Sequence, residues 1–324
     1  EILNMDQNEY STEEYKEEIK KFIDFGAKQI IMTGAPGTGK TFIAKEIAKE
    51  IGGELEWKEN EEEKKYRLVQ FHPSYDYTDF IEGLRPIEKK DNEGADGKIV
   101  FAKKDGIFKK FCRKVATEGD KDKKYVFIID EINRADLSKV FGELMYCLEA
   151  DKRGNRNKVL TPYENLTTYD DEGKKMDNDI FKGGFYIPEN VIIIGTMNDI
   201  DRSVDSFDFA MRRRFRFIEI KADERLEMLD VLGEKKEEAI RRMTALNNEI
   251  AKVKDLNENY HIGGAYFLKL KTLNFDKLWS DYLKPLLQDY VRGMYDEDII
   301  MKKFERAYLN VLPKVGDGND GIQD

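Results

Sequence analysis

Short apolar segments alternate with charged segments over the first two thirds of the chain. The segments at residues 30–33, 125–129 and 191–194 have the length of strands, and continuous apolar strands are typical of a parallel sheet covered on both faces. Residues 43–51 instead repeat isoleucine at every fourth position, which gives a helix one apolar face. This alternation of strands and helices predicts an α/β fold with a parallel sheet flanked by helices.

The last third of the chain has a helical pattern. Apolar residues recur at helical spacing between residues 240 and 250, and again between residues 283 and 290. These stripes predict a small C-terminal helical lid domain that follows the α/β core. The expected boundaries are an N-terminal helix and linker at 1–27, the core at 28–221, the lid at 222–315 and a flexible tail at 316–324.

Composition restricts the possible function classes. Of 324 residues, 40% are hydrophobic and 37% are charged, and the formal net charge is −10. This acidic balance argues against a stand-alone nucleic-acid binder, which usually carries a basic surface. No apolar run reaches the length of about 20 residues that crosses a bilayer, and no signal-peptide pattern opens the chain. Cys112 and Cys147 fall in apolar helical patterns, so we expect buried free thiols and a cytoplasmic protein.

The segment GAPGTGKT at residues 34–41 matches the phosphate-binding motif G-x-x-x-x-G-K-[ST] in full. It lies between a predicted strand and a predicted helix, where glycines let backbone N–H groups surround a phosphate. Lys40 would reach the β- and γ-phosphates, and the Thr41 hydroxyl would bind Mg²⁺. The expected nucleotide-binding residues are Gly34, Ala35, Pro36, Gly37, Thr38, Gly39, Lys40, Thr41 and Phe42.

Two acidic residues, Asp130 and Glu131, follow the predicted strand at 125–129. In P-loop enzymes an aspartate at the end of such a strand holds Mg²⁺. A neighbouring glutamate is suited to orient and deprotonate a water molecule. Acidic residues after a strand are often ordinary loop residues, but the P-loop upstream favours a catalytic interpretation. We therefore expect Thr41 and Asp130 to bind the metal and Glu131 to act on the water.

A polar segment, GTMNDIDRS at residues 195–203, follows the predicted strand at 191–194. Ligands of open α/β sheets bind beyond the carboxyl ends of the strands, so Asn198 is expected to face the same γ-phosphate. A neutral amide there can hydrogen-bond the phosphate or hold the attacking water without adding negative charge. The alternative is an Asn-Asp turn that is held by local side-chain hydrogen bonds.

Three successive arginines, Arg212, Arg213 and Arg214, precede another apolar segment. One chain's own phosphate site does not need all three, whereas an arginine supplied by a neighbouring subunit stabilises charge on a transferring phosphoryl group. We therefore expect Arg213 and Arg214 to act in trans. The alternative is a basic surface cluster that pairs with nearby acidic residues.

Together these motifs resemble those of the AAA+ nucleoside triphosphatases and, among them, the McrB family closely. The resemblance rests on GAPGTGKT, IIDEINRAD, GTMNDIDRS and AMRRRF, and on HPSYDYTDFIEG at 72–83 and IGGAYF at 262–267. It covers residues 28–270 well. Two places depart from the family pattern: Asp199-Ile200 stands where MNTADRS has Thr-Ala, and Gly264-Ala265 stands where the lid element IGHSYF has His-Ser.

The resemblance implies the motor subunit of a modified-cytosine-dependent restriction system. It implies Mg²⁺-dependent hydrolysis of GTP in preference to ATP, a homo-oligomeric ring, expected to be hexameric, and stimulation by an McrC-like nuclease subunit. It also implies functional roles for Asn198 and Asp201. In the family a domain that precedes the motor reads DNA, so we expect DNA contact only through such a reader or through the partner.

The residues alone leave other interpretations open. The same core serves ATP-driven remodelling enzymes of the MoxR or midasin kind, and nucleotide preference separates these enzymes from the restriction motor. A nucleotide-switched scaffold with little intrinsic turnover is a third interpretation.

Two further segments have alternative interpretations. A basic helix that carries Lys109, Lys110, Arg113 and Lys114 is either a solvated face, which we favour, or a DNA-facing patch. Residues 151–186 are polar and rich in glycine, so they predict a hairpin and loop, which either face a pore or partner or form a mobile surface loop.

Overall fold

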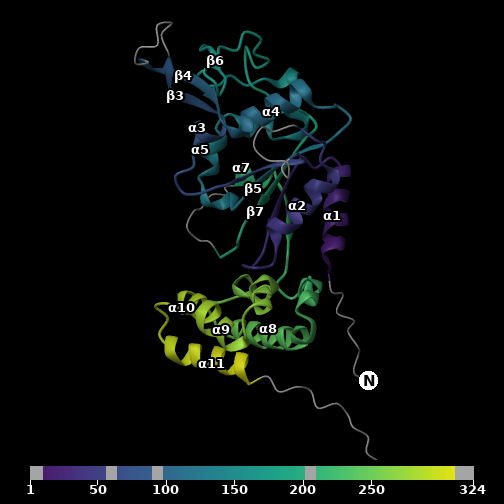
Figure 1. Ribbon diagram of the computed structural model, residues 1–324, viewed down its shortest axis with the longest axis vertical. Helices are drawn as coiled ribbons and strands as arrows, with labels where there is room; N and C mark the ends of the chain where they lie inside the picture. The colour runs from purple at the N-terminus through teal and green to yellow at the C-terminus, as the bar shows by residue number, and fades with distance from the viewer. Residues whose placement is uncertain (1–9, 56–63, 90–97, 201–208, 311–324) are drawn as a thin grey trace, which may run out of the picture. The chain divides into compact units, whose positions relative to one another are not determined.

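The computed structural model describes residues 10–55, 64–89, 98–200 and 209–310, and these fall into two compact units (Figure 1). We call the first the core unit; it comprises Glu13–Thr33 and Lys40–Glu219. The second, the lid unit, comprises Ile220–Asp324, the loop Gly34–Gly39 and residues 1–12, in so far as these are described. Each unit has its own hydrophobic core.

A parallel sheet of five strands forms the centre of the core unit, in the order β2-β5-β7-β1-β8. The strands are β1 Gln29–Thr33, β2 Tyr66–Gln70, β5 Tyr125–Asp130, β7 Val191–Thr196 and β8 Arg216–Glu219. Because β7 pairs with both β5 and β1, the three apolar segments lie side by side with their carboxyl ends at one edge. This arrangement confirms the predicted α/β class and parallel sheet.

Helices and short turns surround this sheet (Figure 1). They are α1 Thr12–Asp24, α2 Lys40–Ile51, α3 Tyr77–Phe80, α4 Ile107–Glu118, η2 Ile132–Arg134, α5 Leu137–Phe141, α6 Leu144–Cys147, η3 Ala150–Lys152, η4 Asn155–Asn157 and α7 Phe209–Arg212. A cluster of aromatic rings joins α3, α4 and β5: Phe80 stacks on Phe108 at a centroid distance of 4.8 Å, and Phe108 meets the edge of Phe127 at 5.0 Å. Fully buried rings of this kind contribute large apolar area to the core.

A second sheet has three strands, with β3 Glu82–Lys89 antiparallel to β4 Lys98–Asp105 and β6 Thr168–Tyr169 parallel to β4. The segment 151–186 supplies β6. It pairs with itself only through single bridges between Val159 and Phe185 and between Tyr169 and Lys175. The expected hairpin is present only as these short antiparallel contacts, and the strand β6 of the segment joins β4, far away in the sequence.

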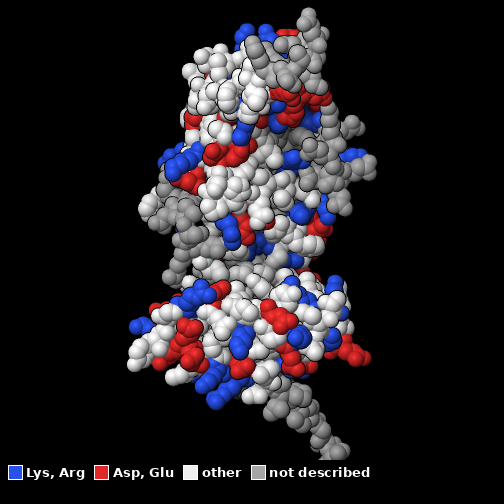
Figure 2. Space-filling model, turned by 60° about the vertical axis from the view of Figure 1, so that its left-hand side comes forward, with Lys and Arg blue, Asp and Glu red and all other residues white. Residues whose placement is uncertain are grey.

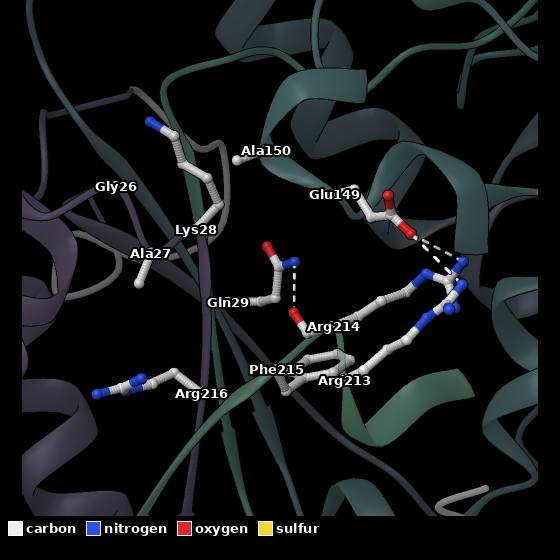
Figure 3. A pocket seen from close by; sticks show the side chains of 10 residues that line it. All are labelled: Gly26, Ala27, Lys28, Gln29, Glu149, Ala150, Arg213, Arg214, Phe215 and Arg216. Atoms are coloured by element: carbon white, nitrogen blue, oxygen red, sulfur yellow. Dashed lines mark hydrogen bonds and ion pairs between the residues drawn. The ribbon is translucent and has the colours of Figure 1, made fainter. Parts of the chain in front are cut away.

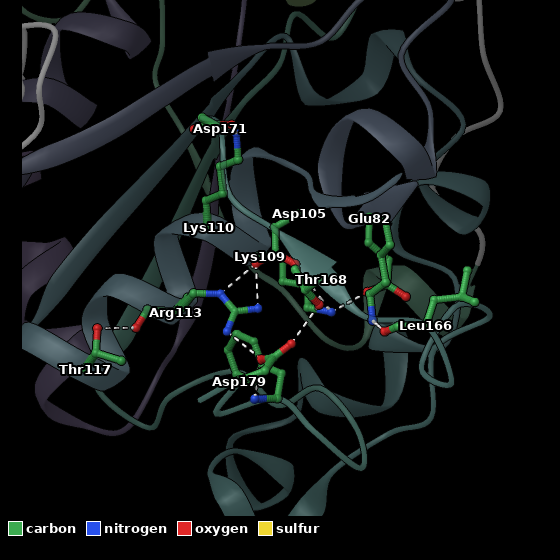
Figure 4. Close-up of polar contacts among 12 residues, drawn as sticks. Glu82, Asp105, Lys109, Lys110, Arg113, Thr117, Leu166, Thr168, Asp171 and Asp179 are labelled. Atoms are coloured by element: carbon green, nitrogen blue, oxygen red, sulfur yellow. Dashed lines mark hydrogen bonds and ion pairs between the residues drawn. The ribbon is translucent and has the colours of Figure 1, made fainter. Parts of the chain in front are cut away.

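The basic helix α4 is not the solvated face that the sequence favoured. Lys109 is buried and forms an ion pair with Glu82, which is also buried (Figure 4). Arg113 bonds to Asp105 at 2.7 Å and to Asp179 at 2.5 Å. Burial by itself raises the pKa of Asp179, but hydrogen bonds from Arg113 and Thr168 outweigh that effect and lower it to about 2. These pairs fasten α4 to the second sheet and to the segment 151–186.

The two more exposed cations of α4 also have acidic partners. Lys110 lies 2.5 Å from Asp171, and Lys114 lies 3.2 Å from Glu118. On the face shown in Figure 2, Lys and Arg side chains are interspersed with Asp and Glu side chains. This pairing of charges gives no support to a DNA-facing patch on α4.

The lid unit is helical, as the sequence predicted. Its elements are η5 Leu226–Lys235, α8 Lys236–Ile250, η6 Glu258–Tyr260, η7 Gly264–Lys271, α9 Phe275–Leu278, η8 Trp279–Leu283, α10 Lys284–Val291 and α11 Glu297–Leu309. The two predicted stripes meet in one cluster, in which Met243 and Leu246 of α8 are buried together with Leu287 of α10. Phe304 and Tyr308 of α11 complete that cluster.

Two expectations from composition can be compared with the described residues. Cys112 and Cys147 are both buried and free, as predicted, and burial raises the pKa of the Cys112 thiol well above its usual value. Within the part of the chain that the structure describes, no helix is both long enough and apolar enough to cross a membrane.

Candidate functional site

Asp130 accepts two short hydrogen bonds at the carboxyl edge of the main sheet. Its Oδ1 atom accepts from the hydroxyl of Thr41, in the first turn of α2, and from the hydroxyl of Thr196, at the end of β7, both at 2.6 Å. The parallel pairing of β5 with β7 brings Asp130 and Thr196 together, since parallel strands end at the same edge. Three chain segments therefore converge on one carboxylate.

The oxygen atoms of Thr41 and Asp130 fit a Mg²⁺ site of the kind that phosphates complete. Mg²⁺ is usually bound through one or two carboxylates, water and substrate phosphates rather than by an all-protein cage. Among the described residues, no group of three or more His, Cys, Asp or Glu side chains could hold a metal. The donor set present here is thus one hydroxyl and one carboxylate, which suits an ion that arrives with a nucleotide.

Glu131 has an unusual backbone conformation. Its φ of 53° and ψ of 44° are left-handed, which is costly for a residue other than glycine and recurs at functional sites. Its N–H donates to the Thr196 hydroxyl at 3.3 Å. The same threonine hydroxyl thus contacts both acidic residues, Asp130 and Glu131, at the end of β5.

Two side chains hold the carboxylate of Glu131. The amide of Asn198 donates to Oε1 at 3.1 Å, and Nε of Arg134 donates to Oε2 at 3.0 Å. Asn198 therefore lies at the edge of the sheet where the sequence predicted it, and the group that it contacts is Glu131. The local turn that we considered as the alternative does not describe this contact between residues 67 positions apart.

Sequence reasoning missed one residue of this site, Arg134. Thr196 belongs to the segment 195–203 that was expected at this end of the sheet, but it was given no task of its own. Arg134 stands three residues after Glu131, at the end of the 3-10 helix η2. One turn of this helix brings the two side chains together as an ion pair.

The P-loop has the backbone that its sequence predicts. Gly34, Gly37 and Gly39 have φ values of 135°, 79° and 83°, a range that favours glycine. Lys40 is buried at the first position of α2, and Phe42 is exposed two residues later. The residues Gly34, Ala35, Pro36, Gly37, Thr38 and Gly39 group with the lid unit, whereas Lys40, Thr41 and Phe42 belong to the core unit.

Arg213 and Arg214 lie near the amino ends of the strands of the main sheet, whereas Asp130 lies at the carboxyl end of β5. They precede β8, which runs parallel to β1, so they flank the amino ends of these strands. There they line an open pocket of about 620 Å³ beside Glu149 (Figure 3). Arg214 lies 3.0 Å from the Glu149 carboxylate and Arg213 lies 3.9 Å from it. The structure therefore brings neither arginine to the chain's own Asp130, and Asp201 lies outside the described residues.

Comparison with known proteins identifies two regions of the chain. Residues 29–215 match the AAA domain family (dynein-related subfamily), and residues 238–298 match the alpha-helical lid domain of McrB. The chain is 41% identical over 297 residues to the Type IV methyl-directed restriction enzyme EcoKMcrB subunit of Escherichia coli (strain K12), covering 87% of this chain and 57% of that protein.

A more distant similarity links the chain to the Type II restriction enzyme BsuMI component YdiS of Bacillus subtilis (strain 168). The two are 27% identical over 202 residues, which cover 58% of this chain and 55% of that protein. The chain thus spans little more than half the length of either relative. With its phosphate-binding loop, paired acidic residues and helical lid, the chain belongs to the dynein-related subfamily of AAA domains and is McrB-like.

Proposed function

We propose that this chain is the Mg²⁺-dependent, GTP-preferring nucleoside triphosphatase motor of an McrBC-type system that restricts modified DNA. The observation that carries the proposal is the cluster of Thr41, Asp130, Glu131 and Asn198 at one edge of the sheet. The printed descriptions of the two relatives, a restriction-enzyme subunit and a restriction-enzyme component, support the restriction role. The preference for GTP rests on the resemblance of the motifs to McrB.

Each residue of the cluster has a proposed task. Lys40 and the loop 34–39 bind the phosphates, and Phe42 is proposed to take part in nucleotide binding. Thr41 and Asp130 hold Mg²⁺. When bound, the ion neutralises charge on the phosphate oxygens. Glu131 accepts the proton of the attacking water, and Asn198 orients the Glu131 carboxylate; Asp201 is proposed to act with them.

The assembly is also part of the proposal. Arg213 and Arg214 lie across the sheet from their own Asp130, which supports a ring, proposed to be a hexamer, in which they serve the neighbouring subunit. An McrC-like nuclease subunit would stimulate hydrolysis. DNA would be recognised by that partner or by a separate reader domain, and the system would act in the cytoplasm.

A second candidate function is a nucleotide-switched scaffold with little turnover of its own. It is favoured by the two hydrogen bonds that Asn198 and Arg134 donate to Glu131, because a carboxylate held twice is less available to a water molecule. In this interpretation a partner has to release Glu131 before hydrolysis proceeds.

Equilibrium competition between GTP and ATP tests the proposed function. Fluorescent GTP and ATP analogues are titrated with the purified chain and Mg²⁺, and unlabelled nucleotides then displace them. We expect a guanine preference of tenfold or more, which corresponds to about 1.4 kcal/mol. Lys40→Ala serves as the control, since its loss of binding ties the signal to the P-loop.

Either other outcome changes the assignment. An adenine preference would transfer the chain to the ATP-driven remodelling branch with the same core. Binding of neither nucleotide by the wild-type chain would contradict the proposed function.

Asn198→Ala is expected to impair hydrolysis more than binding. The variant removes a hydrogen bond to a charged group, so kcat should fall about tenfold or more while the Kd for the triphosphate changes little. Asn190→Ala is a matched control, because its amide caps the carbonyls of Asp120 and Lys123 at the other end of β7. Equal losses of kcat and binding in Asn198→Ala would mean that Asn198 only shapes the strand end.

A further inference from the structure

Within the lid unit, residues that follow the main sheet in sequence bind the loop Gly34–Gly39. Three successive carbonyl oxygens of the loop accept hydrogen bonds from lid residues. The pairs are Pro36 O with Gly263 N at 2.9 Å, Gly37 O with Ala265 N at 2.9 Å, and Thr38 O with Arg225 Nη1 at 2.5 Å. Two of the donors are backbone amides at the start of η7, Gly263 just before it and Ala265 within it, and the third is the guanidinium of Arg225.

These bonds determine where the amides of the loop point. In a planar trans peptide the C=O and N–H groups point in opposite directions. The N–H groups of Gly37, Thr38 and Gly39 therefore point away from the lid donors. Successive N–H groups that are presented on one side form the concave anion site of a P-loop. The lid donors thus orient the amides that the proposed function assigns to the phosphates.

Of these three donors, Arg225 alone bonds through its side chain, and its surroundings are unusual. Only 2% of the residue is exposed, and its φ of 59° is left-handed. Both a buried guanidinium and a left-handed non-glycine backbone cost stability unless specific contacts compensate for them. Nε of Arg225 lies 4.0 Å from the Glu227 carboxylate, which compensates part of this cost.

The glycine that faces Arg225 explains how closely the guanidinium approaches the loop. Gly39 has a φ of 83°, and a Cβ atom added to it would lie 2.3 Å from Nη1 of Arg225. The guanidinium therefore occupies the space that any side chain at position 39 would need. Gly39 and Arg225 fit each other as a pair.

Arg225 also joins the P-loop to Tyr10 and to Thr12, the first residue of α1. Its Nε donates to the Thr12 hydroxyl at 2.9 Å, and its own N–H donates to the carbonyl of Tyr10 at 2.8 Å. Glu227 accepts from both the N–H and the hydroxyl of Thr12, at 2.8 and 2.5 Å. One side chain thus links residues 10–12, the start of η5 and the loop at Thr38.

We propose that Arg225 is a positioning residue of the phosphate-binding loop, and that it couples the segment at Thr12 to that loop. It does not touch the substrate. It holds the peptide between Thr38 and Gly39 so that the Gly39 N–H faces the phosphates, and Thr12 holds Arg225. This inference rests on the proposed nucleoside triphosphatase function.

Arg225→Met tests the proposal by removing the guanidinium while keeping the length of the side chain. We expect the affinity for the preferred Mg-triphosphate to fall about tenfold, as expected for a lost charge-assisted hydrogen bond. The affinity for inorganic pyrophosphate, measured by competition, should fall by a similar factor, because the substitution acts on the part of the site that binds phosphates. Arg225→Lys, which keeps a charged donor, should restore part of the affinity.

Arg242→Met is the matched control within the same unit. Arg242 bonds to Glu238 and to the Tyr308 carbonyl, and its contacts do not include the P-loop. The Arg242→Met variant should have a lower Tm than the wild-type chain and an unchanged nucleotide affinity. Unchanged affinity in Arg225→Met, or an equal loss in Arg242→Met, would overturn the inference while leaving the proposed function in place. A wild-type chain that binds no nucleotide would overturn both.

Thr12→Val keeps the proposal testable if Arg225→Met folds poorly. The variant removes the hydroxyl that Arg225 Nε binds and that donates to Glu227, and we expect a loss of affinity of about threefold, because Thr12 acts on the loop only through Arg225. In the Arg225→Met background the same change should have no further effect, because the two residues act as one unit. Additive losses would contradict the coupling through Arg225.

Discussion

Glu131→Gln is expected to stop hydrolysis while nucleotide binding is retained. An amide cannot accept the proton of the attacking water, and loss of a positioned general base lowers kcat by about 10²–10⁴-fold. Gln keeps the shape of Glu and can still accept a hydrogen bond from Arg134 or Asn198, so the site should keep its geometry. Single-turnover hydrolysis and equilibrium binding, measured on the same preparation, check the two halves of this expectation.

Glu118→Gln is the control for that experiment. Glu118 pairs with Lys114 at the end of α4, so its replacement also removes one carboxylate and one ion pair from the core unit. It should leave both kcat and binding unchanged. Turnover by Glu131→Gln at the wild-type rate would remove Glu131 from the chemistry and would leave the hydrogen bonds around it a structural role.

The features that the sequence predicted correctly are local ones. The P-loop needs only the glycines and the helix period that follows it, and β5 and β7 need only short apolar runs with polar ends. Because parallel strands end at one edge, the proximity of Asp130 to the end of β7 followed from the fold class alone. These predictions used interactions between residues close in sequence, together with one general property of parallel sheets.

The features that the sequence did not predict depend on distant partners. Lys109 appeared to belong to a solvated helix face, yet its partner Glu82 stands 27 positions earlier in another strand. Arg225 likewise contacts Thr38, 187 positions away, and no local pattern marks that pairing. Charged residues are buried only when paired, and a sequence pattern without tertiary contacts does not reveal the pair.

Arg213→Ala is expected to lose turnover without losing stability, whereas Arg214→Ala is expected to lose both turnover and stability. The side chain of Arg213 is 68% exposed and lies 3.9 Å from Glu149, so removing this weak surface pair costs little. The side chain of Arg214 is 12% exposed and pairs with Glu149 at 3.0 Å, so its removal breaks an ion pair whose guanidinium is largely buried. An arginine supplied in trans contributes about 10³–10⁵-fold to kcat, so the Arg213→Ala defect should be large. Thermal melts and steady-state rates of the two variants separate these roles.

Mixing two inactive variants decides whether Arg213 acts on a neighbouring subunit. Arg213→Ala subunits keep an intact Glu131, and Glu131→Gln subunits keep an intact Arg213. In a mixed ring some sites combine the Glu131 of one subunit with the Arg213 of the next, so hydrolysis should return in part. As a control, Arg213→Ala subunits are mixed with subunits that carry both Glu131→Gln and Arg213→Ala. No subunit of this mixture has Arg213, so it should stay inactive. If the first mixture also stays inactive, Arg213 acts within its own chain or in no chemical step, and the exposed guanidinium beside Glu149 would have to be explained as a surface contact.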